Sequence, residues 1–335
     1  MHDTTLPWHR RDLARFVIGL VEAAAVVALS ASILGCFGKW HWFLDLFSHF
    51  RGQYFIGLAG CAALLLIFRR WWITPLCVLG MLANGVALRP LFESDEPRAS
   101  SSPDGSFLRV VSYNLYFENP AHEPTLRWLR ESNADIIYLC EVTPAWSAAI
   151  RRELGSLYPH QHHAPQGDPF GAALLSRQPW LRVEEKQFGP FDAPALAAFF
   201  GENPRGGKVV LGMHPTPPNG RRGSEARDAA FAEATRWLRS QTPRAKIVLG
   251  DLNATIWSAG LFTMMQQTGL EDTGAGFGWQ PTWMCDSLFF QIPIDHILIS
   301  KQWKVADRRI GPDLGSDHRA VIADLRYVGG RELWP

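Results

Sequence analysis

The stretch IVLGDLNAT, residues 247–255, predicts both a fold class and the position of a functional site. Its first residues, 247–249, are apolar at every position, which is typical of a strand whose sheet is covered on both faces. The polar residues Asp251 and Asn253 follow directly, where the strand ends. An Asx-type turn would explain these two side chains equally well. The interpretation therefore depends on whether other strands end in the same way.

The same pattern recurs along the chain after residue 106. Short apolar runs predict further strands at 108–113, 136–140, 172–176, 195–200, 209–213, 294–299 and 320–325. Helices are expected at 124–131, 144–154, 224–240 and 256–267. Covered strands that alternate with helices predict a layered α/β domain.

Nearly all of these strands end in a carboxylate, an amide or an imidazole. The residues are Asn114 in VVSYNLYF, Glu141 in DIIYLCEV, His214 in VVLGMHPTPP, Asp295 in IPIDHILIS, and Asp317 with His318 in GSDHRAV. Each has an ordinary alternative: Glu141 would suit the start of the next helix, and His214 a structural role. Their recurrence at strand ends, where α/β folds gather functional groups, favours a common site.

Carboxylate and amide oxygens without cysteine suit Mg²⁺ or Mn²⁺ rather than zinc. Glu141 and Asp317, together with Asn114 or Asp251, are candidate ligands. The five cysteines show neither zinc-type spacing nor a disulfide framework. A hard cation beside a histidine that titrates near neutrality suits phosphate-ester hydrolysis. Asp295, an acid inside an apolar run, would be buried in order to orient His318.

The motifs together resemble those of the endonuclease/exonuclease/phosphatase superfamily, which is DNase I-like. In chain order they are SYNL (112–115), LCEV (139–142), GAALLSR (171–177), GMHP (212–215), GDLNAT (250–255), QPTW to IDHIL (280–298) and GSDH (315–318). The resemblance covers about 107–327. Leu252 stands where an aromatic residue is commoner, and the DNA-gripping insertions of the repair nucleases are not evident.

This resemblance implies a four-layer α/β sandwich, two mixed β-sheets flanked by helices, and hydrolysis of a phosphodiester or phosphomonoester by in-line attack of water. It implies Mg²⁺ or Mn²⁺ as cofactor. The implied roles are metal binding by Glu141, Asp317 and Asn114, phosphate binding by Asn253, His214 and Asn114, and catalysis by Asp251, His318, Asp295 and His214.

The N-terminal part of the chain contains three apolar runs, about 16–37, 53–69 and 71–91, which predict three transmembrane helices. Buried helices of a soluble protein are one alternative, and a cleaved signal peptide is another for the first run. We therefore expect a membrane region at 1–92, a flexible Pro/Gly/Ser-rich linker at 93–106 and a catalytic domain at 107–328.

Positive charge sets the expected orientation of these helices. Arg10, Arg11 and Arg15 precede the first run, and Arg69 and Arg70 join the second to the third. This bias places the N-terminus in the cytoplasm and the catalytic domain on the other side. With a resemblance to membrane-attached bacterial members, the expected location is a bacterial inner (plasma) membrane. The helices make the lipid bilayer a partner, and no protein partner is implied.

The charge balance bears on the substrate. With 33 Lys and Arg against 32 Asp and Glu, the net charge is +1, which gives no hint of a broad nucleic-acid surface. A phospholipid or inositol-phosphate headgroup and DNA or RNA are the alternative substrates. A membrane-tethered binding module without catalysis is a third alternative, disfavoured because every motif position is filled.

Overall fold

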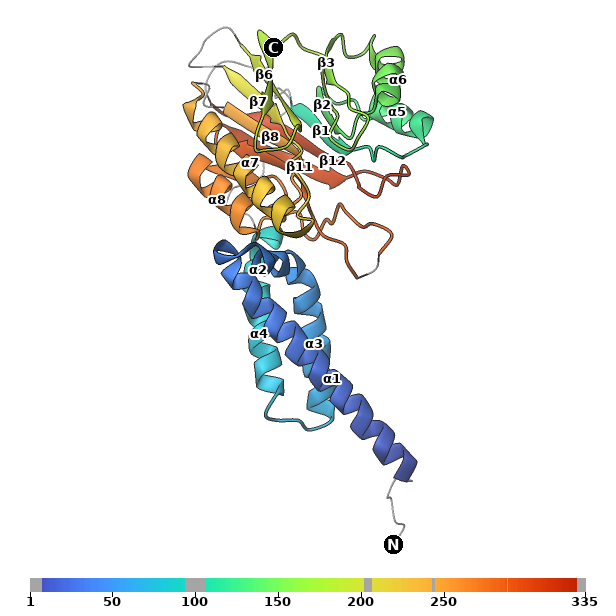
Figure 1. Ribbon diagram of the computed structural model, residues 1–335, viewed down its shortest axis with the longest axis vertical. Coiled ribbons are helices and arrows are strands. Elements are labelled where there is room, and N and C mark those ends of the chain that lie inside the picture. The colour runs from blue at the N-terminus through green and yellow to red at the C-terminus, as the bar shows by residue number, and fades with distance from the viewer. Residues whose placement is uncertain (1–7, 94–106, 202–206, 243–244, 288, 330–335) are drawn as a thin grey trace. The chain divides into compact units, whose positions relative to one another are not determined.

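The computed structural model describes residues 8–93, 107–201, 207–242, 245–287 and 289–329 (Figure 1). The chain divides into two compact units, Met1–Arg89 and Pro90–Pro335. Each unit is described by itself below.

The first unit is helical. It contains α1 (Trp8–Leu34), η1 (Gly35–Trp40), α2 (Trp42–Leu46), η2 (Phe47–Phe50), α3 (Arg51–Ile67) and most of α4 (Thr74–Phe92). Three helical stretches, 12–40, 42–67 and 74–92, are long and apolar enough to cross a membrane. They coincide closely with the three apolar runs, so the prediction of three such helices is confirmed.

Polar side chains connect the helices of this unit. Glu22 of α1 forms an ion pair with Arg70, its Oε1 lying 2.5 Å from the Arg70 Nε. The Arg51 guanidinium, at the start of α3, donates to the Ser32 carbonyl at 3.1 Å and to the Asn84 Oδ1 at 3.3 Å. Charged groups among apolar helices are costly unless paired, and these contacts pair them.

The second unit contains two six-stranded sheets. The first has the order β11-β12-β1-β2-β4-β3. Its strands are β1 (Leu108–Asn114), β2 (Ile136–Cys140), β3 (His160–Ala164), β4 (Ala172–Ser176), β11 (Trp303–Ile310) and β12 (Val321–Tyr327). The second sheet has the order β5-β6-β7-β8-β10-β9. Its strands are β5 (Arg182–Gln187), β6 (Pro194–Phe200), β7 (Lys208–Gly212), β8 (Ala245–Asp251), β9 (Leu270–Asp272) and β10 (Asp295–Ser300).

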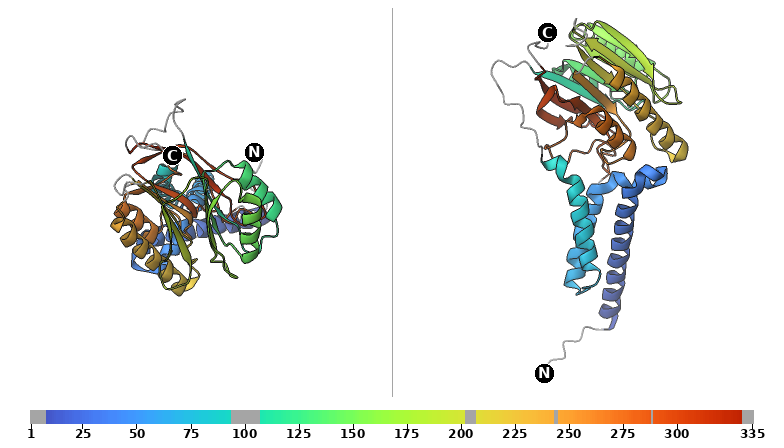
Figure 2. Two further views of the ribbon diagram at one scale, coloured as in Figure 1. Left: turned by 90° about the horizontal axis from the view of Figure 1, so that it is seen from above. Right: turned by 90° about the vertical axis from the view of Figure 1, so that its left-hand side faces the viewer.

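The sheets lie face to face, with helices on their outer sides (Figure 2). Residues such as Val110 and Tyr138 fill the space between the sheets, whereas their neighbours Val111 and Ile137 point outward. Helices α5 (His122–Glu131) and α6 (Pro144–Leu154) cover the first sheet, and α7 (Gly220–Ser240) and α8 (Ala259–Thr268) cover the second. The predicted four-layer α/β sandwich is confirmed.

Strand direction gathers the polar residues at one end of this sandwich. β1 and β2 are parallel, and Asn114 at the end of β1 lies beside Cys140 at the end of β2. Asn114 and Glu141, the residue after Cys140, are therefore at the same end of this sheet. β10 runs antiparallel to β8 and begins where β8 ends, which places Asp295 directly opposite Asp251. β12 is antiparallel to β1, so the residues just before β12 also lie at this end.

Candidate active site

Asn114 joins the two sheets at this end of the molecule. Its buried side-chain amide donates to Glu141 Oε1 at 2.8 Å and to Asp251 Oδ2 at 3.0 Å. Its own Oδ1 accepts a hydrogen bond from the Tyr116 N–H at 3.0 Å. One amide therefore fixes a carboxylate from each sheet.

Glu141 is held in an unusual backbone conformation directly after β2. Its φ is 59°, in the left-handed region that costs a residue other than glycine on the order of 1–3 kcal/mol. This turn aims the carboxylate at Asn114, while its Oε2 accepts from the Phe117 N–H at 2.9 Å. Stored strain at a buried carboxylate is typical of functional positions.

Asp251 is the acceptor on which several groups converge. Its Oδ1 accepts from the Asn253 N–H at 2.9 Å, and its Oδ2 lies 3.3 Å from the His214 Nε2. Burial alone would raise the pKa of Asp251, but the charges of His318 and His214 lower this pKa to about 2. The carboxylate is therefore ionised at neutral pH.

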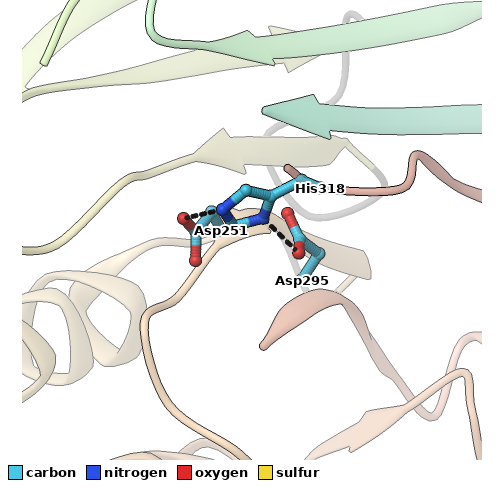
Figure 3. A group of neighbouring side chains, drawn as sticks. All are labelled: Asp251, Asp295 and His318. Atoms are coloured by element: carbon cyan, nitrogen blue, oxygen red, sulfur yellow. Dashed lines mark hydrogen bonds and ion pairs between the residues drawn. The ribbon is translucent and has the colours of Figure 1, made fainter. Parts of the chain in front are cut away.

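His318 lies between two carboxylates (Figure 3). Its Nδ1 is 2.8 Å from Asp295 Oδ2, and its Nε2 is 3.6 Å from Asp251 Oδ2. Burial would lower the pKa of His318, but the Asp295 and Asp251 carboxylates outweigh it and raise this pKa to about 10. The ring is thus an imidazolium at neutral pH.

Asp295 is positioned by a hydroxyl group that lies outside its own strand. Thr282 Oγ1 accepts from the N–H groups of Ile294 and Asp295, each at 3.1 Å. Burial raises the pKa of the Asp295 carboxyl, against the charge of His318. Within the described residues, the second oxygen of Asp295 has no hydrogen-bond partner.

His214 and Asn253 complete the second sheet's contribution. Burial would lower the pKa of His214, but its hydrogen bond to Asp251 and the charges of Asp251 and Glu141 raise it. Its Nδ1 has no partner among the described residues. Asn253 has a φ of 50°, and its side-chain amide donates to the Pro215 carbonyl at 3.0 Å.

Asp317 is half-buried and accepts a hydrogen bond from the Trp283 indole N–H at 3.3 Å. Asp317 follows Ser316, whose hydroxyl donates to the Asn114 carbonyl, and this contact brings the last motif to the end of β1.

All the residues predicted for the site lie at this one end of the sandwich. The sequence reading missed Thr282, Trp283 and Ser316. Ser316 Oγ donates to the Asn114 carbonyl at 2.8 Å and accepts from the His318 N–H at 3.0 Å, which ties the last motif to the first. Their only signal in the sequence is their place inside the PTW and GSDH motifs.

The side chains present fit a divalent cation. The site contains two imidazoles, those of His214 and His318, and four carboxylates, those of Glu141, Asp251, Asp295 and Asp317. In the described part of the chain, the ion pairs that these acids form are all with histidine. Asp251, Asp295 and His318 are close enough to share one ion. However, an imidazolium has no free lone pair, so His318 does not suit this role. Excess negative charge from oxygen donors nevertheless matches a hard cation.

A family model, the Endonuclease/Exonuclease/phosphatase family, matches residues 111–318. The chain belongs to this family. Members of the family generally hydrolyse phosphoester bonds and typically depend on a divalent metal ion. The predicted superfamily membership is confirmed.

Solved structures show the same fold. An endonuclease/exonuclease/phosphatase from Beutenbergia cavernae is 18% identical, with a TM-score of 0.54 over 67% of this chain and 72% of that chain. TDP2 from D. rerio, complexed with a single-strand DNA product, is 15% identical, with a TM-score of 0.53 over 66% and 99%. The human Nocturnin catalytic domain with bound sulfate is 17% identical, with a TM-score of 0.53 over 66% and 94%. A comparison with curated proteins finds no match.

Proposed function

We propose that this chain is a membrane-anchored, divalent-metal-dependent phosphoesterase that hydrolyses a phosphodiester or phosphomonoester by in-line attack of water. One observation carries the proposal. Asn114 joins Glu141 of one sheet to Asp251 of the other, directly beside the buried His318–Asp295 pair. Family membership supports phosphoester hydrolysis in general.

In this proposal Glu141, Asp317 and Asn114 hold Mg²⁺ or Mn²⁺. The bound ion would neutralise the charge of the phosphate and polarise it. Glu141 suits this task because the N–H groups of Asn114 and Phe117 fix both of its oxygens while leaving further lone pairs free.

Asp251 orients the attacking water and accepts its proton. It is ionised, buried and fixed by the Asn253 N–H, which are the properties of a positioned acceptor. His318 donates a hydrogen bond to the phosphate or a proton to the leaving oxygen, with Asp295 holding the ring in place. His214, whose Nδ1 is unpartnered among the described residues, and Asn253 bind the non-bridging oxygens.

The membrane part of the proposal is supported by the three apolar helices and by the arginines that flank them. It comprises a membrane region at 1–92, a linker at 93–106 and a catalytic domain at 107–328 in a bacterial inner membrane, with the catalytic domain extracytoplasmic. Apart from Glu93, the proposed linker lies outside the described residues.

A lipid or inositol-phosphate headgroup is the favoured substrate. Anchoring raises the local concentration of a membrane-borne ester, and a net charge of +1 provides no excess for a polyanion. DNA or RNA is the second candidate, supported by the DNA product bound to the structurally similar D. rerio TDP2. A binding module without catalysis is disfavoured because all the proposed catalytic groups are present.

The test uses the purified full-length chain with Mg²⁺ or Mn²⁺ and four substrate classes: DNA, RNA, phospholipid and inositol phosphate. We expect hydrolysis of at least one class, abolished by excess EDTA and by Asp251→Asn. Full activity in EDTA or in the variant would overturn the mechanism. Preference for DNA or RNA over both headgroup classes would replace the favoured substrate.

A further inference from the structure

The loop from Trp283 to Ile292 exposes a group of large apolar side chains. Met284, Phe289 and Phe290 are 37%, 75% and 55% exposed. In the described residues from 107 to 329, the other exposed large apolar side chains, such as Phe262 on α8 at 50%, are far apart in the sequence. Grouped exposure of this kind marks an interaction surface more often than scattered exposure does.

This loop is attached directly to the active site. Trp283 and Ile292 pair through their backbones at the base of the loop, with N···O distances of 3.1 and 3.3 Å. Trp283 also forms a backbone bridge with His318, and its indole donates to Asp317. The exposed Met284 is therefore one residue away from a contact of the catalytic histidine.

Polar groups inside the loop are paired with one another. The hydroxyl of Ser287 accepts from the N–H groups of Phe289 and Phe290 at 3.3 and 3.1 Å. The Gln291 side chain donates to the Cys285 carbonyl at 3.0 Å, and the Ser287 N–H donates to the Met284 carbonyl at 2.8 Å. Each of these pairings lowers the cost of moving the loop into a less polar medium.

We propose that loop 283–292 inserts Phe289 and Phe290 into the interface of the bilayer that holds the chain's own helices, and that the active site acts on phosphoesters of lipids in that bilayer. This inference rests on the proposed function and specifies its substrate class. Phenylalanine side chains of segments that lie on a membrane bury in the boundary between the headgroups and the acyl chains. Asp286, the one charged residue of this loop, is exposed and can remain in the headgroup layer.

The bilayer that holds the chain's own apolar helices is the partner expected to contact this loop. Fourteen residues, 93–106, separate the end of the third apolar helix at Phe92 from Phe107, the residue before the first strand. Even fully extended, such a segment spans at most about 50 Å. The domain that carries the loop therefore stays close to any membrane that holds the third helix.

Photocrosslinking of the full-length chain in phosphatidylcholine nanodiscs tests the insertion without requiring activity. The photoreactive analogue p-benzoylphenylalanine replaces one residue at a time: Phe289, Phe262 as the matched exposed aromatic control, or Leu79 on α4, which is 66% exposed, as the membrane control. We expect lipid adducts at 289 and 79, and none at 262.

Each of the other possible patterns of lipid adducts would reject a specific part of the proposal. Adducts at 79 but not at 289 would reject the loop insertion and leave membrane anchoring intact. Adducts at 262 as well would show that exposure alone explains labelling, and the loop proposal would fall. No adduct at 79 would reject membrane anchoring itself, and the loop proposal with it.

A kinetic comparison tests the substrate class. The double variant Phe289→Ser/Phe290→Ser should hydrolyse phospholipid in the nanodisc roughly tenfold more slowly or worse, since two apolar rings are lost from the interface. Its rate on soluble bis(p-nitrophenyl) phosphate should stay within about twofold of the wild type, and Phe262→Ser should change neither rate. An equal loss on both substrates, or no loss on phospholipid, would contradict delivery by the loop.

Discussion

Asp295 and His296 are neighbours on β10, and each belongs to a buried imidazole–carboxylate pair. Because successive side chains of a strand point to opposite faces, the two pairs lie on opposite sides of the sheet. Asp295 binds the Nδ1 of His318, and His296 Nδ1 binds Asp272. In both pairs burial would lower the pKa of the histidine, and the carboxylate charge raises it.

The pairs differ in what surrounds them. In the His296–Asp272 pair, which we call the enclosed pair, both ring nitrogens of His296 have partners, because its Nε2 also bonds the Ala254 carbonyl at 2.9 Å. Asp272 also accepts a hydrogen bond from the Gly274 N–H. His318 instead directs its Nε2 toward Asp251, beside Asn114 and Glu141, and Asp295 keeps an oxygen without a partner among the described residues. A buried His–Asp pair thus indicates catalysis only where unused polar atoms remain next to it.

The largest expected effect is that of Asp251→Asn. The amide cannot accept the proton of water, so the rate should fall by about 10⁴-fold. Steady-state kinetics on the best substrate of the panel would measure it. Near-UV circular dichroism should be unchanged, and a rate within tenfold of the wild type would remove Asp251 from the mechanism.

Substitutions in the His318–Asp295 pair should have the second-largest effect on the rate. His318→Gln and Asp295→Asn should each reduce the rate by roughly 10²–10³-fold, because the first removes the donor and the second its orienting carboxylate. Kinetics of both single variants and of the double variant would measure this. If the two act as one unit, the double variant should be little worse than His318→Gln, whereas multiplicative losses would contradict the coupling.

The enclosed pair should behave in the opposite way. His296→Gln removes the charged partner of buried Asp272 and leaves beside this carboxylate the charge of Arg308 and the Gly274 N–H, which should reduce the free energy of unfolding by about 3 kcal/mol. Chemical denaturation of the full-length chain would measure this loss. The rate below the unfolding transition should stay within about fivefold of the wild type, because the His296 side chain bonds Asp272 and the Ala254 carbonyl rather than a proposed catalytic group. A loss of rate as large as that of His318→Gln would erase the distinction between the pairs.

The last prediction concerns the dependence of stability on pH. The pKa of His318 is about 10 in the folded protein, above its ordinary value of 6.5. Its stabilising contribution is therefore complete below pH 6.5 and is lost as the pH rises toward 10, by at most ~1.4 kcal/mol per pH unit. Unfolding of wild type and His318→Gln between pH 6 and 10 should show a flatter curve for the variant. Parallel curves would show that His318 is not charged in the folded state.

Sequence reasoning found the central strands and missed the edge strands. β2 and β4 were predicted at their observed bounds, because apolar residues cover both of their faces. The four strands that were not expected, β3, β5, β9 and β11, are the outermost strands of the two sheets. Their sequences, such as HQHHA and RVEEKQ, are polar because an edge strand is partly solvated. Apolar patterning therefore cannot reveal them.

The site divides in a similar way. Charged residues in apolar surroundings, such as Asp251 and Asp295, were visible because their burial is costly without a purpose. Thr282 and Ser316 were not, since a hydroxyl is unremarkable in a sequence and gains its role only from the register that brings it to a distant backbone. The left-handed backbone of Glu141 likewise has no signature in its residue type.

The central claim is that Glu141 binds the metal ion while His318 performs chemistry. Binding of Mn²⁺ to the full-length chain, followed by electron paramagnetic resonance, tests it most directly in Glu141→Ala and His318→Gln. The account predicts at least about tenfold weaker binding in Glu141→Ala, as for loss of a direct ligand, and wild-type affinity in His318→Gln. Loss of Mn²⁺ binding in His318→Gln with retention in Glu141→Ala would place the ion among Asp251, Asp295 and His318 and contradict the account.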